Sequence, residues 1–358
     1  MILSYGGSFQ GRSHIDKNVP CQDSSYHGKI SNDCVLLVVA DGVGSAKHSE
    51  ESSKIAVDTV VECIAETNLY SIDLLKEIYE KANNRIYDYA ESKGNSVLDY
   101  DTTLSLALMF NDGHILWAHS GDGGIIAIKE SGEYEAITKP QNGPDFISVI
   151  PLRGGSKYWE FGESEGPYAS VLVMTDGILD IMQPGLLRLS DCSVYVPMVR
   201  YFGENAYSLS SDNIEEFAKS RLDFMNGSGC ESVTDDRSLV VGIHENIKPK
   251  ILEPSYYAEP DWEKLKLIWR KKAYPHLSSE DSEIDDIDPL KEPRQDNIQS
   301  TTGQDNLTND SNSISSELTS DTDNFEKQSL NDDANVGSKI QNFSKKGKNM
   351  LSQIINRK

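Results

Sequence analysis

Short runs of apolar residues, separated by polar turns, predict a series of β-strands along the first two thirds of the chain. The clearest run, residues 35–40, holds six apolar residues in succession, which is typical of a strand buried on both faces. Shorter runs rich in β-branched and other apolar residues predict further strands at residues 2–8, 102–110, 114–119, 125–129, 169–175 and 238–243. The sequence Asn-Asp-Gly at 111–113 predicts a hairpin turn between two of them.

A second periodicity, with apolar residues three or four positions apart, predicts helices between these strands. One helix is expected to start at Ser49, where Glu50 and Glu51 suit the positive end of a helix dipole. Further helical patterns cover residues 73–92, 186–202 and 212–226. The first two helices are long and consecutive, so we expect them to lie antiparallel on one face of a sheet.

Two stretches, residues 11–25 and 140–168, combine proline, glycine and polar groups and predict irregular connections. The order of the elements, with strands first bracketed and then split by pairs of helices, predicts a layered α+β domain with two sheets inside and helices outside.

Charge divides the chain into a body and a tail. The formal net charge is −23, and residues 280–338 carry 16 acidic and three basic residues, a net charge of −13. This segment has too few apolar residues to offset the entropy of ordering, and we expect it to be disordered. The body is acidic but ordinary in composition, and nothing in it suggests nucleic-acid binding.

The remaining compositional features favour a soluble cytoplasmic protein. The five cysteines have no metal-type or redox-type spacing, which is typical of reduced thiols in the cytosol. The N-terminus lacks the basic start and apolar core of a signal peptide. No apolar run reaches the ~20 residues that span a bilayer.

The end of the chain holds two further helical patterns. Around residues 262–272, Trp262, Leu265, Ile268 and Trp269 share one face, which predicts a helix docked on the domain, with a partner site as the alternative. Residues 339–358 carry six basic residues and no acidic one, typical of an amphipathic helix that binds a membrane surface or an acidic partner; a weak helix folded back on the acidic segment is equally compatible. The predicted parts are a domain over 1–250, a helical extension over 251–277, an acidic linker over 278–338 and a basic helix over 339–358.

Aspartates recur at strand ends or beside glycine, and they are the candidate chemistry of the chain. The positions are Asp23, Asp41, Asp122, Asp176 and Asp235. Each taken alone has a simpler explanation as a turn former, helix cap or solvated charge. Several flank strands that must pair in one core, so their side chains can converge, and converging carboxylates repel unless a cation neutralises them. Oxygen ligands without nearby cysteine or histidine pairs favour Mg²⁺ or Mn²⁺ over zinc.

Six blocks of sequence carry a resemblance to a known family. They are Arg12 with Gln22-Asp23, V-V-A-D-G-V-G-S, D-T-T-L-S-L-A-L, W-A-H-S-G-D-G-G, V-M-T-D-G-I-L-D and T-D-D-R-S-L-V-V. In order and approximate spacing, over about residues 4–245, the chain resembles the metal-dependent protein phosphatases of type 2C (the PPM family), in particular those of bacterial type. The resemblance implies a four-layer α-β-β-α sandwich of two antiparallel sheets flanked by helix pairs, with a two-metal site at one edge.

The resemblance also implies roles for individual residues. Asp41 is expected to bridge two ions, and the Gly42 carbonyl to help bind one. Asp23 is expected to hold a metal or its waters, and Arg12 to bind the phosphate. The implied metal-binding set is Asp23, Asp41, Gly42, Asp122, Asp176 and Asp235, with Asp122 serving a third, more weakly held ion. Thr102 and Thr103 are expected to buttress the site from a strand.

The chain departs from the family pattern at several positions. Val43 stands where many members have a histidine proposed as general acid, so a water or His14 is left for that role, whereas His119 is expected to be a packed core histidine. Arg12 lies farther from the Gln-Asp pair than in the family. Glycines 123 and 124 follow Asp122 where Ser-Arg is common, and the connection over 140–167 stands where the family carries a mobile flap.

The function that the resemblance implies is hydrolysis of phosphoserine and phosphothreonine in proteins by a metal-activated water, with Mn²⁺ or Mg²⁺ as cofactor. The expected partner is a phosphorylated protein, either a cognate serine/threonine kinase or its targets. The alternatives are a phosphatase-like binding module without turnover, and a metal phosphohydrolase acting on small phosphate esters. The complete set of aspartates argues against the first alternative, and a metal titration of turnover separates it from an enzyme.

Overall fold

The computed structural model describes residues 1–143, 148–188, 194–204, 209–227, 230 and 233–273. Residues Met1–Leu265 belong to one compact unit, and residues 266–273 belong to a second. The expectations for the acidic linker over 278–338 and the basic helix over 339–358 lie outside the described residues. None of the helices in the described part is long and apolar enough to cross a membrane.

Two five-stranded antiparallel sheets form the centre of the first unit. The strands of one sheet, in spatial order, are β1 (Ile2–Phe9), β10 (Arg237–His244), β9 (Tyr168–Met174), β6 (Gly124–Lys129) and β7 (Tyr134–Ala136). The strands of the other are β2 (Ser24–Lys29), β3 (Cys34–Ala40), β4 (Leu104–Phe110), β5 (Ile115–Ser120) and β8 (Glu160–Ser164).

Helices and short 3₁₀ turns connect these strands. The α-helices are α1 (Arg12–Lys17), α2 (Ser49–Ala65), α3 (Ile72–Lys93), α4 (Asp176–Met182), α5 (Gly185–Arg188), α6 (Val196–Gly203), α7 (Ile214–Asn226) and α8 (Trp262–Ala273). The 3₁₀ turns are η1 (Val97–Tyr100), η2 (Leu152–Gly154) and η4 (Pro254–Tyr257).

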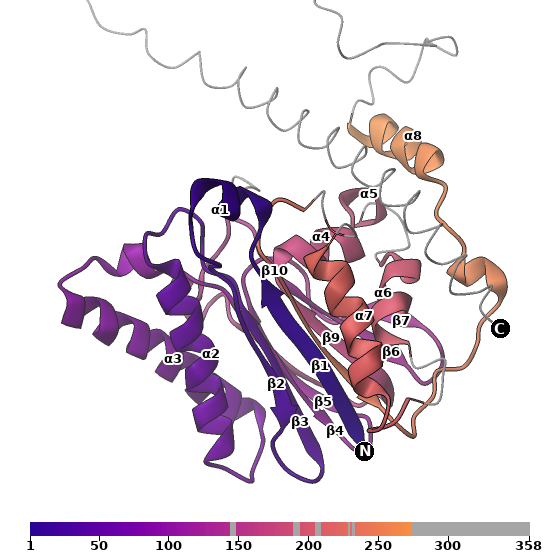
Figure 1. Ribbon diagram of the computed structural model, residues 1–358, viewed down its shortest axis with the longest axis horizontal. Helices are drawn as coiled ribbons and strands as arrows, with labels where there is room; N and C mark the ends of the chain where they lie inside the picture. Colours follow the sequence, from indigo (N-terminus) through magenta and orange to yellow (C-terminus); the bar gives the residue numbers. More distant parts are fainter. Residues whose placement is uncertain (144–147, 189–193, 205–208, 228–229, 231–232, 274–358) are drawn as a thin grey trace, which may run out of the picture. The chain divides into compact units, whose positions relative to one another are not determined.

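The two sheets pack face to face, and helices cover their outer faces (Figure 1). In β3, Leu36 and Val38 face α2 and α3, whereas Leu37 and its odd-numbered neighbours face the other sheet. In β9, Leu172 faces α4, α6 and α7, and Val173 faces the space between the sheets. Continuous apolar runs occur because both faces of these strands are buried. The predicted α-β-β-α sandwich is confirmed.

Most predicted elements coincide with observed ones within two or three residues. The helices expected from Ser49 and over 73–92 are α2 and α3, which pack on the same face of one sheet. The turn at residues 111–113 closes the β4–β5 hairpin, where the Gly113 N–H donates to the Phe110 carbonyl at 2.8 Å. Gly113 has a φ of +89°, in the region that glycine favours.

The two stretches predicted as irregular contain regular structure. Residues 11–25 include helix α1 and the start of β2, and residues 140–168 include η2 and β8. Both strands lie at the edge of their sheet and are only partly buried, so they lack the apolar run that marks a central strand. The pattern over 186–202 covers two separate helices, α5 and α6, rather than one.

The segment that follows β10 packs on the helices outside the first sheet. Tyr256, Tyr257 and Leu265 contact this cluster, and Trp262 is buried in it. The Trp262 ring lies 5.5 Å from that of Tyr195, edge to face. The first turn of the predicted C-terminal helix is therefore docked on the domain, as its apolar face indicates.

Candidate metal centre

The loops that carry the aspartates meet at one end of the sandwich because of the strand register. The end of β3 at Ala40 pairs with Ser24, the first residue of β2. In the other sheet, Gly124 at the start of β6 pairs with Met174 at the end of β9. The residues that follow β3, precede β6 and follow β9 consequently lie together.

Three carboxylates converge there. One oxygen from each of Asp41, Asp122 and Asp176 lies within 4.8 Å of the others. Burial raises the pKa of Asp41 well above its ordinary value, and the negative charges of its aspartate neighbours raise it further. The pKa of Asp176 is raised in the same way, by burial and then by the charges of Asp122 and Asp235. Three carboxylates this close hold excess negative charge that a divalent cation would neutralise.

A fourth aspartate, Asp23, lies beside this group and is almost fully buried. The Thr175 hydroxyl donates to its Oδ2 at 2.9 Å. Burial raises the pKa of Asp23 to about 7 and that of Asp122 to about 6. Oδ1 of Asp23 and Oδ1 of Asp122 are buried and have no hydrogen-bond partner within the described residues. Free, buried carboxylate oxygens are the donors that a hard cation requires.

The backbone of Asp41 is fixed by two threonines that precede β4. The Asp41 N–H donates to Thr103 Oγ1 at 2.9 Å, and the Asp41 carbonyl accepts from the Thr102 hydroxyl and the Thr103 N–H, both at 2.8 Å. The two threonines thus support the Asp41 backbone as expected, but from positions just before β4 and not from within a strand. The adjacent Gly42 donates its N–H to the Gln22 carbonyl at 3.1 Å, which ties the Asp41 turn to the residue before Asp23.

The Asp235-Asp236 pair divides into one exposed and one buried carboxylate. The side chain of Asp235 is 59% exposed, and Asp235 is not in the group of three carboxylates. Asp236 is buried, and its carboxylate accepts from the N–H groups of Gly11 and Gln22, both at 2.6 Å. Asp236 thus anchors the segment that leads to Asp23. The role of Asp235 as a ligand stays a prediction.

The other candidate side chains occupy different surroundings. Arg12 begins α1, is 73% exposed and lies 3.9 Å from Asp16, so no contact among the described residues brings it to the carboxylates. His14 Nδ1 lies 2.9 Å from Asp236 Oδ2. His119 is fully buried, with Nδ1 2.8 Å from the Ser105 hydroxyl, and burial lowers its pKa to about 4. His119 is therefore a packed core histidine, as expected.

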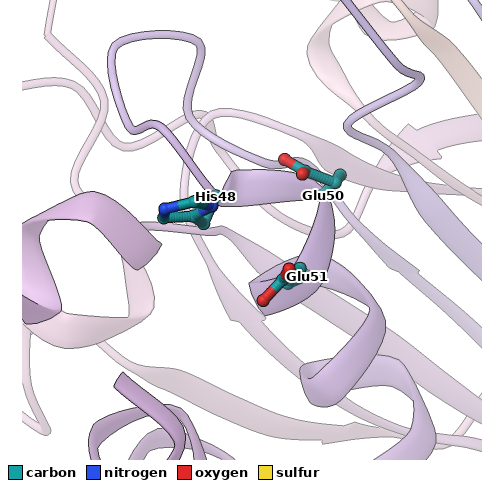
Figure 2. Close-up of side chains that lie close together, drawn as sticks. All are labelled: His48, Glu50 and Glu51. Carbon is teal, nitrogen blue, oxygen red and sulfur yellow. The ribbon is translucent and has the colours of Figure 1, made fainter. Parts of the chain in front are cut away.

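A second group of metal-type side chains lies at the start of α2, where His48, Glu50 and Glu51 bring ligand atoms within 4.8 Å of one another (Figure 2). The His48 ring is stacked on Tyr100 at 5.0 Å. Oε2 of Glu51 is buried without a hydrogen-bond partner in the described residues. The positive end of the α2 dipole stabilises the negative charges of both glutamates and repels a cation.

Sequence reasoning missed three contributors to the site. Thr175 and Asp236 hold Asp23 and its loop, and Arg153 forms a bidentate ion pair with Asp101, next to the two threonines. The spacing of the sequence does not show that Asp236, and not its neighbour Asp235, is the buried member of the pair. Arg153 lies in the stretch predicted to be irregular, where no periodicity marks a partner.

Comparison with known proteins gives a match to one family. Residues 10–221 match the family model described as protein phosphatase 2C. No curated protein sequence matches the chain. Among solved structures, the chain is similar to a bacterial serine phosphatase, with 17% identity and a TM-score of 0.50 over 70% of this chain and all of that one. It is likewise similar to the serine/threonine phosphatase of S. agalactiae, with 15% identity and a TM-score of 0.50 over 68% of this chain and all of that one.

Proposed function

Because the chain belongs to the protein phosphatase 2C family and is a metal-dependent protein serine/threonine phosphatase, we propose that its converging aspartates hold the divalent ions. The proposed ligands are Asp23, Asp41, the Gly42 carbonyl, Asp122, Asp176 and Asp235. The observation that carries the proposal is the approach of Asp41, Asp122 and Asp176 within 4.8 Å, beside a buried Asp23.

The donor set fits hard divalent cations. Every proposed ligand is an oxygen, and two carboxylate oxygens are buried without a partner in the described residues. We propose Mn²⁺ or Mg²⁺, two ions with a third held more weakly at Asp122, because these cations prefer carboxylate, carbonyl and water oxygens.

The bound ions would supply an activated water at neutral pH and stabilise the phosphoryl oxygens. Threonine side chains position two of the proposed ligands. Thr102 and Thr103 fix the Asp41 backbone, and Thr175 fixes the Asp23 carboxylate. Asp23 is buried, whereas Asp41, Asp122 and Asp176 are half-buried, so the site stays within reach of solvent and substrate. Arg12, exposed at the start of α1, is proposed to meet the substrate phosphate as the substrate docks.

The proposed substrate is a phosphoserine or phosphothreonine side chain in a protein that a kinase has modified, and the proposed setting is cytoplasmic signalling. We propose that the connection over 140–167 shapes substrate choice. The basic segment over 339–358 is proposed to contact an anionic membrane surface or an acidic partner, and co-sedimentation with anionic and neutral vesicles, comparing the full chain with one ending at 338, tests this.

The test of the metal centre is hydrolysis of p-nitrophenyl phosphate and of a phosphothreonine peptide, with Mn²⁺ and with EDTA. Wild type is expected to turn over both substrates only with metal. Asp41→Asn and Asp176→Asn are expected to lower kcat/KM at least about a hundredfold while keeping the fold, as judged by circular dichroism. Lys54→Met, which removes an exposed ion pair with Asp58 on α2, is the matched control and is expected to leave turnover unchanged. No turnover in folded, metal-loaded wild type would instead favour the binding module.

A further inference from the structure

An ion pair between η2 and the loop before β4 lies one residue from the threonines that hold Asp41. Arg153 Nε donates to Asp101 Oδ1 at 2.6 Å, and Arg153 Nη2 donates to Oδ2 at 2.8 Å. Both side chains are partly buried, at 31% and 15% exposure. A bidentate arginine–carboxylate pair fixes orientation as well as distance.

The backbone of residues 101–103 connects this ion pair to the Asp41 turn. On one side, the Val43 N–H donates to the Asp101 carbonyl at 3.0 Å, and Thr102 and Thr103 hold Asp41 as described above. On the other side, the Leu152 N–H donates to the Thr102 carbonyl at 2.8 Å. Asp101 and Thr102 are therefore held by η2 on one side while they hold the Asp41 turn on the other.

The η2 side of this arrangement is itself packed in the core. Leu152 is buried in the core beneath α2 and α3, and its carbonyl accepts from the Trp159 indole N–H at 2.9 Å. The Ser52 hydroxyl, on α2, also lies 3.4 Å from the Asp101 carbonyl. The ion pair thus links a packed part of the long connection to the backbone that carries the proposed metal ligand.

We propose that Arg153 is a positioning residue whose ion pair with Asp101 sets the affinity of the Asp41 site for divalent ions. The inference rests on the proposed function of that site and goes beyond it, because it makes η2 part of the metal-binding framework. Partners that orient metal ligands typically change metal affinity 10–100-fold when they are replaced.

The test measures metal affinity directly, by calorimetric titration of Mn²⁺ into metal-free full-length protein. Arg153→Met is expected to weaken Mn²⁺ binding by about tenfold and to raise the half-activating Mn²⁺ concentration for p-nitrophenyl phosphate hydrolysis equally. At saturating Mn²⁺, kcat should stay within about twofold of wild type, because Arg153 acts through Asp101 and not on the substrate. Arg85→Met breaks the ion pair with Glu62 on the outer helices and is expected to change neither quantity.

A double-mutant comparison separates positioning from general destabilisation. Asp101→Asn combined with Arg153→Met should weaken Mn²⁺ binding no more than Arg153→Met alone, because the two side chains act as one unit. Arg153→Lys keeps the positive charge but loses the bidentate guanidinium geometry, and it should give an intermediate Mn²⁺ affinity. It also serves as the test if Arg153→Met does not fold.

Two outcomes would overturn the inference. One is wild-type Mn²⁺ affinity in a folded Arg153→Met or Arg153→Lys variant; the other is an affinity loss in the double variant equal to the product of the single losses. Wild-type protein that binds no Mn²⁺ and shows no metal-dependent turnover would contradict the proposed function itself, so the two failures are distinguishable.

Discussion

Gly42 lies too close to two backbone carbonyl groups for any side chain to fit. A Cβ there would lie 2.6 Å from the Ser49 carbonyl oxygen and 2.7 Å from the Gln22 carbonyl oxygen, and both are backbone atoms that cannot move aside independently. Gly42→Ala is therefore expected to lower the free energy of unfolding by about 1–3 kcal/mol and to displace the Asp41 turn, with loss of metal-dependent hydrolysis.

The neighbouring Gly44 provides the control for this prediction. A Cβ at Gly44 would meet, within 4 Å among the described residues, Gln22 Oε1 alone, at 3.8 Å. Gly44→Ala should keep both stability and turnover, as measured by urea unfolding and p-nitrophenyl phosphate hydrolysis. Equal behaviour of the two variants would show that the loop adapts and that the close approach is not required.

His119 should give the protein a specific response to acid. Burial lowers its pKa from 6.5 to about 4, so below pH 6.5 the unfolded chain binds a proton that the folded protein excludes. The stabilisation is complete above pH 6.5 and is lost as the pH falls towards 4, at about 1.4 kcal/mol for each unit of pKa difference. His119→Gln should have a smaller difference in unfolding free energy between pH 7 and pH 4.5 than wild type, measured in EDTA. An unchanged difference would contradict the prediction.

The aspartates that were expected to converge, and that do lie close together, share a strong local signal. Asp41 follows an unbroken apolar strand and precedes glycine, and Asp176 repeats that arrangement, so both could be placed at strand ends and expected to converge. Arg153 and Asp236 carry no such signal. Their roles arise from partners 52 and more than 200 positions away, and a single sequence does not reveal which distant residues meet.

Among the elements, the segment from Gly11 to Asp23 depends on the loop just before β10. Asp236 receives two backbone N–H groups of this segment and lies against His14. Asp236→Asn replaces one accepting oxygen by an NH₂ group, and we expect it to lower the unfolding free energy of the metal-free protein by about 1–3 kcal/mol. Amide hydrogen exchange over residues 10–23 should also become faster.

Asp235→Asn is the matched comparison, one residue away and largely exposed. It should leave the stability of the metal-free protein within about 0.5 kcal/mol of wild type. If Asp235 is a ligand as proposed, the same change should weaken Mn²⁺ binding. Similar stability losses for both variants would contradict the division of the pair into an anchoring residue and a ligand.

Element prediction succeeded where burial imposes a regular pattern on the side chains and failed at the polar edge strands β2 and β8. Strands β3 and β9 are buried on both faces and produce apolar runs, while α2 and α3 bury one stripe and produce a helical period. Edge strands β2 and β8 are partly exposed and rich in polar residues, so their backbone pairing leaves little trace in the side chains. Helix α1 has only six residues, too few for a periodicity to emerge.

For the molecule as a whole, residues 251–265 are expected to be part of the folded domain rather than an appendage. The Tyr256 hydroxyl accepts the N–H of edge strand β7 at Tyr134, at 2.8 Å, and the Arg200 guanidinium lies 4.1 Å from the centre of the Tyr257 ring. Trp262 fills a position beside Tyr195. The Tyr256 contact occupies a backbone N–H of edge strand β7, a group that an uncovered edge would leave open to pairing with another chain.

A chain ending at residue 277 should therefore unfold at the same urea concentration as the full chain and keep its turnover of p-nitrophenyl phosphate. A chain ending at residue 250 should lose at least about 3 kcal/mol of stability, the amount typical of removing one buried tryptophan, and should tend to aggregate. Trp262→Ala in the full chain isolates the largest of these contacts and should fall between the two. Equal stability of the chains ending at 250 and 277 would place the domain boundary at residue 250, the predicted end of the domain.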